Sequence, residues 1–453
     1  MKNRNSIDMI NGPLLKNIII FSLPLMASNA LQILFNAADT IVVGKFAGDE
    51  ALAAVGATGN LIYLLTCIFQ GLSTGSNVVV ANAIGTNERE RIKKASQTSI
   101  YLGLVSGLFL TILGFFGSKF LLSMVSTPSN IIDLSTLYMK IYFGGSIFMI
   151  VYNFGSAILR SKGDTKRPLN YLIISGVVNL VLNLILVIIF KMSVVGVAIA
   201  TVVSQALSCL LVLNALAHET DETKFIVSEL SLDKNIAIEI LKIGIPAGFG
   251  GMAFSISNVV IQGSINSFNS SIIIAGNSAA ANIEGFVYIG MIAFAQATIT
   301  FTSQNVGANN YKNVHKIYLY GLLLDFISAF LLGFSVWYFG NYIVSLYTND
   351  PLVVEIGVKR LFYIALPLFL NGLLDITVNS LRGMGYSSRP TLIMMLGVCG
   401  FRLLWIWLYF PLHQTLDVIY MCFPISWVIT LTIEIILWTK CYKAFKDNSP
   451  VIL

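Results

Sequence analysis

Charged side chains are scarce in this sequence. Asp, Glu, Lys and Arg make up 11% of the 453 residues, and hydrophobic residues make up 56%, whereas a soluble protein is typically about 25% charged. So small a charged fraction excludes a soluble globular protein. The composition therefore predicts an integral membrane protein whose surface faces lipid.

Paired cysteines and the motifs of soluble enzymes are also missing. The five cysteines stand singly in or beside apolar runs, which excludes a disulfide framework and a cysteine metal site. Neither GxxxxGKS/T nor HExxH occurs, and the three histidines lie in predicted loops. We therefore predict that the chain is not an enzyme and holds no cofactor. Because it has no cradle for ATP phosphates, any transport would be driven by an ion gradient.

A GxSxG match at residues 71–75 is no evidence of a serine hydrolase. It falls inside an apolar helix, and no histidine stands at membrane depth to act as its base. Gly71 and Gly75 instead have the small-residue spacing that permits close helix contact, and Gly244 and Gly248 repeat that spacing.

Long apolar runs are abundant, and they determine the fold class. A spanning helix needs about 20 mostly apolar residues, and twelve such runs can be placed. They cover residues 15–43, 52–82, 96–120, 131–158, 168–190, 194–217, 237–266, 272–304, 315–340, 353–380, 390–411 and 416–441. The first run is too long for a signal-peptide core and is expected to remain as a membrane anchor. The sequence predicts an all-α integral membrane protein with twelve transmembrane helices.

The basic residues are divided unevenly between the two predicted sides. Segments on the side of the N-terminus hold 21 of the 28 Lys and Arg residues, and the opposite loops hold only Lys45, Lys119 and Lys191. Cytoplasmic loops carry such an excess, so both termini are predicted to be cytoplasmic. A nucleic-acid partner is not expected, because these basic residues do not form one continuous surface.

The sequence repeats itself at an offset of 222 residues. The matching landmarks include Pro24 with Pro246, Asn36 with Asn258, Gly85 with Gly307, Arg160 with Arg382, and Arg167-Pro168 with Arg389-Pro390. We predict two six-helix lobes, at residues 1–217 and 235–453, joined by a charged cytoplasmic linker at 218–234. An even number of helices gives parallel repeats, an arrangement typical of transporters that bind substrate between the halves and rock them alternately. Channels can also contain repeats.

A polar stripe in the first apolar run ends in a carboxylate. Ser28, Gln32, Asn36 and Asp39 fall on one face of a helix. An ionised side chain near the membrane centre costs about 2.5–3.5 kcal/mol or more, so Asp39 should face a protein interior or a wet cavity. Asp39 is therefore a candidate cation-coupling residue. The alternative is that it lies at the membrane edge or holds helices together through a fixed cation.

Further oxygen ligands are predicted in the fifth and sixth apolar runs. Asn179 and Asn183 are four residues apart on one helical face, and Thr201 is a hydroxyl on an otherwise apolar surface. If these helices pack on the first, the three side chains and Asp39 could bind Na⁺, since hard cations prefer oxygen ligands. A proton would need Asp39 alone. Alternatively, the three side chains only hydrogen-bond between helices.

The second half lacks the first half's carboxylate. Ile261 stands where the repeat places Asp39, although Asn258 and Gln262 continue a neutral polar stripe. Asp375 could pair with Arg402, or it could face the cleft and attract organic cations.

Four other charged residues in this half are expected near helix ends. Asp325 and Glu434 are expected to approach the cytoplasmic ends of their helices and snorkel, and Lys359 and Arg360 to reach the outer headgroups.

Three segments resemble a known family. NAADTIVVGKFAGDEALAAVG (36–56), LRSKGDTKRP (159–168) and LRGMGYSSRP (381–390), within two six-helix repeats, are similar to the multidrug and toxic compound extrusion (MATE) family. The resemblance extends over nearly the whole chain. It implies two lobes in a V that exchange H⁺ or Na⁺ for lipophilic, mostly cationic drugs.

The resemblance also implies roles for single residues. Asp39 matches the family's acidic residue on the first helix, and Pro24 matches the proline about which that helix bends. Asn179 and Thr201 match members of the cation site in the N-terminal lobe. Asn183 departs from the pattern, because many bacterial relatives have Asp there, and this loss of charge favours H⁺ over Na⁺.

In the C-terminal lobe, Asp375 matches an acid of the tenth helix, and Gln262 stands near a position that is Glu in some relatives. A cation site of this lobe is therefore expected to be incomplete. The substrate or cleft candidates are Gln32, Asn36, Asn258, Gln262 and Asp375.

These expectations describe a monomeric drug–cation antiporter in a bacterial cytoplasmic (inner) membrane, with small-molecule drugs or organic cations and the lipid bilayer as its partners. The alternatives are a lipid-linked oligosaccharide flippase of the same superfamily, which would usually have fourteen helices, a channel, or a membrane-embedded enzyme.

Overall fold

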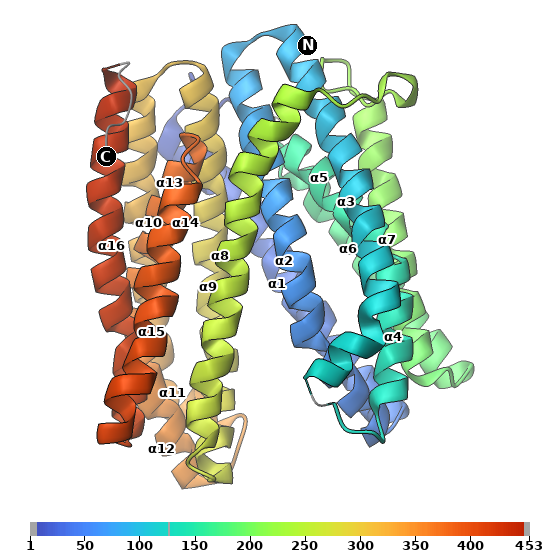
Figure 1. Cartoon of the computed structure of the whole chain (residues 1–453), viewed down its shortest axis with the longest axis vertical. Helices are drawn as coiled ribbons and strands as arrows, with labels where there is room; N and C mark the ends of the chain where they lie inside the picture. The colour runs from blue at the N-terminus through green and yellow to red at the C-terminus, as the bar shows by residue number, and fades with distance from the viewer. Residues whose placement is uncertain (1–6, 126, 448–453) are drawn as a thin grey trace. The chain divides into compact units, whose positions relative to one another are not determined.

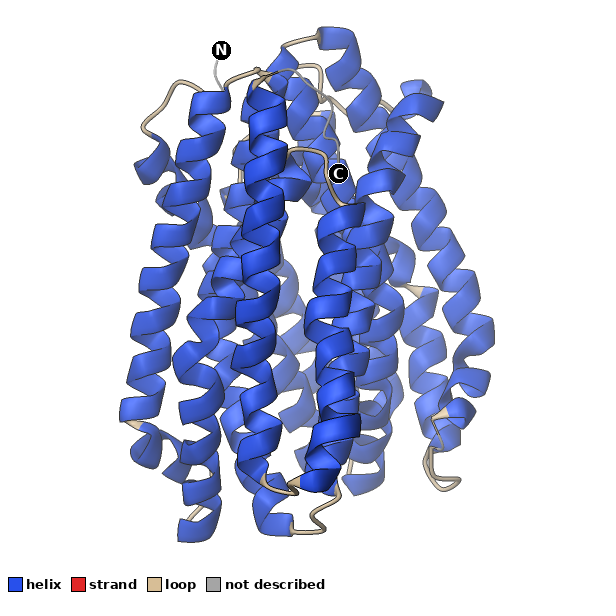
Figure 2. Cartoon of the chain, turned by 60° about the vertical axis from the view of Figure 1, so that its left-hand side comes forward, coloured by secondary structure: helices blue, strands red, loops and turns tan. Residues whose placement is uncertain are grey.

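The computed structural model describes residues 7–125 and 127–447, and within these ranges it contains helices and loops but no strand (Figures 1 and 2). The first half contains α1 (Leu14–Phe46), α2 (Asp49–Thr86), α3 (Arg89–Met124), α4 (Ile132–Gly144), α5 (Ser146–Ser161), α6 (Lys166–Asn183), the π-helix η1 (Leu184–Ile189) and α7 (Ser193–Ala217). A 3₁₀ turn, η2 (Val227–Glu229), lies in the segment that leads to the second half.

The second half has the same plan with more interruptions. It contains α8 (Lys234–Asn266), α9 (Ser271–Gly307), α10 (Tyr311–Tyr338), α11 (Gly340–Ser345), α12 (Pro351–Arg360), η3 (Leu361–Ala365), η4 (Leu366–Leu368), α13 (Phe369–Gly383), α14 (Ser388–Met394), η5 (Met395–Gly400), α15 (Phe401–Leu404), η6 (Trp405–Tyr409), η7 (Phe410–Leu412) and α16 (Leu416–Lys446).

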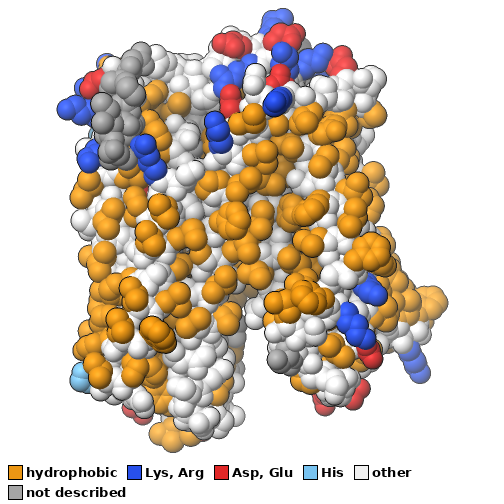
Figure 3. All heavy atoms as spheres, viewed as in Figure 1, with side chains coloured by type: hydrophobic (Ala, Val, Ile, Leu, Met, Phe, Trp, Pro, Cys, Tyr) orange, Lys and Arg blue, Asp and Glu red, His pale blue; other side chains and the backbone are white. Residues whose placement is uncertain are grey.

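Among the described residues, eleven helical segments are long and apolar enough to cross a membrane. The pair α4 and α5, bent by 44° at its break, makes a twelfth span if it is counted as one. On the face shown in Figure 3, apolar side chains cover most of the surface between the two ends, and charged side chains gather toward those ends. The predicted all-α, multi-pass membrane fold is confirmed.

Two interruptions occupy equivalent positions in the two repeats. Gly145 separates α4 from α5, and a Cβ there would lie 2.4 Å from the Val202 side chain. The residue 222 positions later is Pro367, inside the 3₁₀ turn η4, where the missing N–H interrupts the regular helix. Both breaks lie inside apolar runs, so hydropathy alone did not separate them.

The chain packs into two compact units. One consists mainly of Ala27–Gly248, and the other contains Asp8–Met26 and the residues from Phe249 onward. The division therefore falls within α1 and within α8, in each case two residues after the helix's proline, Pro24 or Pro246. We call these unit 1 and unit 2. The lobe limits of 1–217 and 235–453 are a division by sequence repeat and stay a prediction.

Glycine-lined helix contact, as predicted, occurs inside unit 1. A Cβ at Gly71 would lie 2.3 Å from the Gly248 nitrogen, and one at Gly75 would lie 2.4 Å from the Ile240 carbonyl oxygen. A Cβ at Gly244 would in turn lie 2.6 Å from the Cα atom of Leu72. The backbones of α2 and the first half of α8 thus meet directly, and we call this contact the glycine seam.

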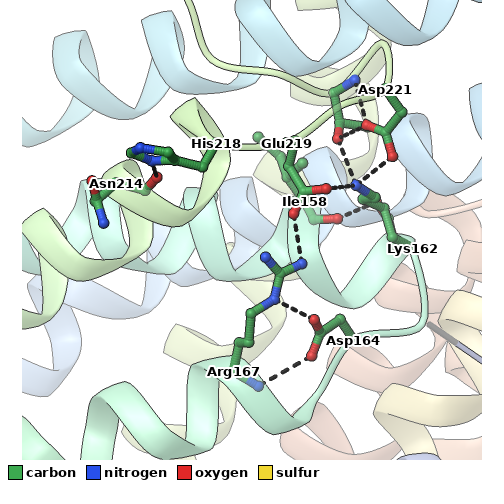
Figure 4. Close-up of polar contacts among 10 residues, drawn as sticks. Ile158, Lys162, Asp164, Arg167, Asn214, His218, Glu219 and Asp221 are labelled. Carbon is green, nitrogen blue, oxygen red and sulfur yellow. Dashed lines mark hydrogen bonds and ion pairs between the residues drawn. The ribbon is translucent and has the colours of Figure 1, made fainter. Parts of the chain in front are cut away.

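The charged linker is bound tightly to unit 1. Glu219, whose side chain is buried, accepts a hydrogen bond from Lys162 Nζ and forms an ion pair with Arg167 Nη2, each at 2.6 Å. Arg167 also pairs with Asp164 (Figure 4). Lys162 pairs at 2.6 Å with Asp221 as well. Burial tends to raise the pKa of Asp221, but hydrogen bonds from Lys162 and Thr223 outweigh it, so the pKa is lowered and the pair persists at neutral pH.

Glu219→Gln is expected to lower the free energy of unfolding by about 1.5–3 kcal/mol, because it removes the buried carboxylate that Lys162 and Arg167 share and leaves each with a single carboxylate partner. Thermal unfolding in detergent measures the loss. The matched control on the same linker is Glu229→Gln, whose partner Lys93 has a side chain 43% exposed. Surface ion pairs contribute about 0–1 kcal/mol, so equal losses in the two variants would contradict a structural role for the buried cluster.

Candidate functional site

Asp39 lies in the second half of α1, within unit 1, and it is half-buried. The Nδ2 group of Asn183 donates to Asp39 Oδ1 at 2.5 Å and also lies 3.2 Å from Asn179 Oδ1. Both asparagines come from α6 and are buried, Asn183 completely. The structure therefore brings Asp39, Asn179 and Asn183 together, a convergence that the sequence allowed only if these helices packed on one another.

The local sequence positions this group in two ways. A Cβ at Gly176 would lie 2.0 Å from the Phe35 ring, so this glycine allows α1 to pack closely on α6 one turn before Asn179. Immediately after Asn183, α6 continues as the π-helix η1. Segments of π-helix are rare in proteins, and those that do occur are often found at functional sites.

The surroundings of Asp39 are largely apolar. Val42 and Val43, one turn further along α1, belong to a cluster of buried side chains that also contains Ala54, Val187 and Val197 of neighbouring helices. Tyr138 belongs to the same cluster. Charges interact more strongly in such a low-dielectric interior than in water.

One buried oxygen beside Asp39 has no partner. Asn183 Oδ1 is inaccessible to solvent and accepts no hydrogen bond from any described residue. Leaving a buried carbonyl unsatisfied costs about 1–3 kcal/mol. The site therefore offers a carboxylate and a free amide oxygen, which are suitable ligands for a proton or a hard cation.

Thr201 is the member of the predicted set whose side chain has no described hydrogen bond to Asp39, Asn179 or Asn183. Its hydroxyl donates to the Val197 carbonyl at 3.0 Å, within α7. Serine and threonine hydroxyls within helices commonly donate to the carbonyl group four residues earlier.

The four amide cleft candidates lie on α1 and α8. Gln32, Asn36 and Asn258 are exposed, and Gln262 donates to Asn266 Oδ1 at 2.9 Å. No described contact assigns them a ligand, so their role in binding stays a prediction. Pro24 lies inside α1, which is helical on both sides of it.

Asp375 does not form an ion pair with Arg402 among the described residues. Arg402 is fully buried, donates from Nε to Ser426 Oγ at 3.0 Å, and lies with its guanidinium 4.2 Å from the Phe423 ring centroid. The half-buried Asp375 shares its helix with Arg382, seven residues later, and no ion pair joins these two described residues either.

Three expectations about snorkelling charges are wrong. Asp325 and Glu434 are completely buried and do not approach the helix ends. Arg360 is also buried, donating to both carboxylate oxygens of Glu284 at 2.9 Å, and to Asn277. The side chain of Lys359, by contrast, is partly exposed, and it pairs with Asp417.

The sequence profile of the MatE family matches residues 24–185 and again residues 246–408. The two matches begin 222 residues apart, which agrees with the internal repeat. The chain is 29% identical over 361 residues to the probable multidrug resistance protein YpnP of Bacillus subtilis, an alignment that spans 79% of this chain and 80% of that protein.

Solved structures give the same picture of the fold. Crystal structures of a MATE protein in the bent and straight conformations superpose with TM-scores of 0.89 and 0.90, each at 21% identity. They cover 97% and 99% of this chain and 98% and 100% of their own. At 21% sequence identity, the structural similarity establishes the fold alone.

Proposed function

The chain belongs to the MatE family, as its resemblance predicted, and we propose that it is a secondary active antiporter that exports lipophilic or cationic small molecules in exchange for H⁺. The relative YpnP is described as a probable multidrug resistance protein. The observation that carries the proposal is the Asp39 carboxylate beside the buried, unpartnered carbonyl of Asn183.

This pair can respond to a proton in a simple way. While Asp39 is ionised, it accepts from the Asn183 amide nitrogen, as the observed hydrogen bond allows. Once protonated, Asp39 carries an O–H donor, and a rotated Asn183 amide can present its oxygen to accept it. The two protonation states therefore favour different arrangements of α1 against α6, which is the differential interaction that a coupling ion needs.

The choice of H⁺ over Na⁺ rests on charge and ligand number. Asp39 is the single carboxylate in this group, and Asn183 contributes a neutral amide. A proton requires one oxygen, whereas a hard metal cation requires several oxygen ligands at once. Asp39 remains the residue that would bind Na⁺ if Na⁺ were the coupling ion.

The transport cycle follows from this assignment. Substrate would enter from the cytoplasm between the lobes, and protonation of Asp39 from outside would rearrange α1 and release the substrate outward. Pro24 supplies a point of bending in α1 because it removes one backbone hydrogen bond. A related MATE protein has been crystallised in bent and straight conformations.

The distribution of basic residues supports the orientation in this proposal. We propose a monomer in a bacterial cytoplasmic membrane, with both termini in the cytoplasm. Its partners are lipids and small-molecule substrates, and it uses no cofactor beyond the coupling ion.

Transport by proteoliposomes tests the coupling. Export of a fluorescent organic cation is expected under an imposed pH gradient and not under a Na⁺ gradient alone. Asn183→Asp adds a second carboxylate and is expected to add Na⁺-driven export. Export by the native chain under Na⁺ but not under a pH gradient would overturn proton coupling, and non-saturating flux without either gradient would indicate a channel.

A further inference from the structure

We propose that unit 2 has a proton-binding site of its own at Asp325, separate from Asp39. Asp325 lies in the middle of α10, roughly 20 Å along the helix from either end. Its side chain is 0% exposed, and neither carboxyl oxygen has a hydrogen-bond partner among the described residues. A buried carboxylate in this situation would lack both water and donors, so the neutral acid is the species that fits.

Gly372 on α13 holds the carboxyl in place. A Cβ at Gly372 would lie 1.9 Å from Asp325 Oδ2 and 2.7 Å from its Cγ atom. The carboxyl thus packs directly against the α13 backbone, in a space that exists only because this residue has no side chain. The Asp325 position is therefore a built contact between two helices.

A second acid lies on α13, one turn after Gly372. Asp375 follows Gly372 by three residues, and its charge acts on that of Asp325. Two carboxylates in a low-dielectric interior disfavour simultaneous ionisation. Asp375 is half-buried whereas Asp325 is 0% exposed, so Asp375 is the better candidate for the ionised member and Asp325 for the protonated one.

The other charged groups on neighbouring helices do not neutralise Asp325. On α9, Glu284 is bound to the α12 residue Arg360. On α13, Arg382 donates from Nη2 to Thr391 Oγ1 at 3.3 Å, and on α16 the two carboxyl oxygens of Glu434 have no hydrogen-bond partner among the described residues.

The nearby phenols also have other partners. Tyr318, on α10 itself, hydrogen-bonds to Thr377 on α13, and Tyr363 of η3 interacts with Asp417. Asp325 therefore has no permanent cationic partner in the described part of the chain.

A proton fits this place better than Na⁺. The acids at this contact are Asp325 and Asp375, and the Gly372 backbone fills the space against the Asp325 carboxyl. A metal ion needs several oxygens arranged around it, whereas a proton needs one.

Infrared spectroscopy of the full-length protein in lipid nanodiscs tests this site without measuring transport. The Asp39→Asn variant is the background, so that Asp39 contributes nothing. Isotope-labelled aspartate is expected to shift a protonated-carboxyl carbonyl band at neutral pH, and Asp325→Asn is expected to remove that band. Because the labelling arm keeps Asp325 unchanged, the test does not depend on Asp325→Asn folding.

Two further variants sharpen the result. Gly372→Ala is expected to displace the carboxyl and to shift or abolish the band. Asp417→Asn, which removes an aspartate that pairs with Lys359 at the surface of the same unit, is expected to reduce only the carboxylate band. The proposal fails if labelling shifts carboxylate bands alone, or if Na⁺ at constant pH removes the protonated band. Proton coupling at Asp39 could stand or fall independently of either outcome.

Discussion

Asp39→Asn is expected to reduce gradient-driven efflux to the level of empty vesicles while leaving the yield of folded protein unchanged. Asparagine keeps the shape of the side chain and can still hydrogen-bond to Asn183, whose Nδ2 now donates to Asp39. What the variant loses is the ability to gain and release a proton. Without two protonation states, a pH gradient has no differential interaction through which to shift the conformational equilibrium.

The measurement is dye export from proteoliposomes, with substrate binding to the same detergent-purified protein measured in parallel. Asp133→Asn is the matched control, because Asp133 also belongs to unit 1 but lies exposed and paired with Lys119 at 3.4 Å. That control should transport normally. Intact export by Asp39→Asn under a pH gradient would show that the coupling residue lies elsewhere.

The helical plan of the molecule could be predicted because membrane insertion imposes it. Each span must bury a long apolar segment and satisfy its backbone internally, so the twelve runs stand out in the sequence. The ends of the helices could not be predicted from hydropathy. They depend on local caps, such as Asp350, which accepts from the Leu352 nitrogen at the start of α12.

The site in unit 1 was partly predictable for a geometric reason. Asn179 and Asn183 share a helical face at any packing angle, and a carboxylate at membrane depth must be directed away from lipid. That α6 would meet α1 at Phe35 and Gly176 is a tertiary fact, which periodicity does not contain. The same is true of Thr201, whose hydroxyl bonds within its own helix.

Buried charges in unit 2 were the main failure of prediction. Arg360 and Glu284 are 76 residues apart and meet only in the folded bundle. A sequence signal was nevertheless available for Asp325, because it stands at the centre of its apolar run, too far from either end for a short side chain to snorkel. The distance of a charged residue from the ends of its apolar run therefore predicts better than its residue type whether its side chain is buried or reaches the membrane surface.

Gly71→Leu is expected to prevent formation of the native glycine seam and to remove most of the folded protein. The atoms that a Cβ at Gly71 would meet are the backbone nitrogen of Gly248 at 2.3 Å and the Gly244 carbonyl oxygen at 2.5 Å. Backbone atoms cannot rotate away, so α2 and α8 would have to separate. Overpacking usually lowers the free energy of unfolding by about 1–3 kcal/mol and sometimes by more. A whole leucine side chain at a backbone contact is expected to cost at least the upper end of this range.

Gly59→Leu provides the matched control on the same helix. A Cβ at Gly59 meets no atom within 4 Å, so this leucine should be accommodated, and it also replaces a poor helix former with a good one. The monodisperse fraction in size-exclusion chromatography and the midpoint of thermal unfolding measure both variants. Equal behaviour of the two would mean that α2 and α8 do not depend on close backbone contact. Loss in Gly71→Leu alone would establish that the folding of unit 1 depends on the glycine seam.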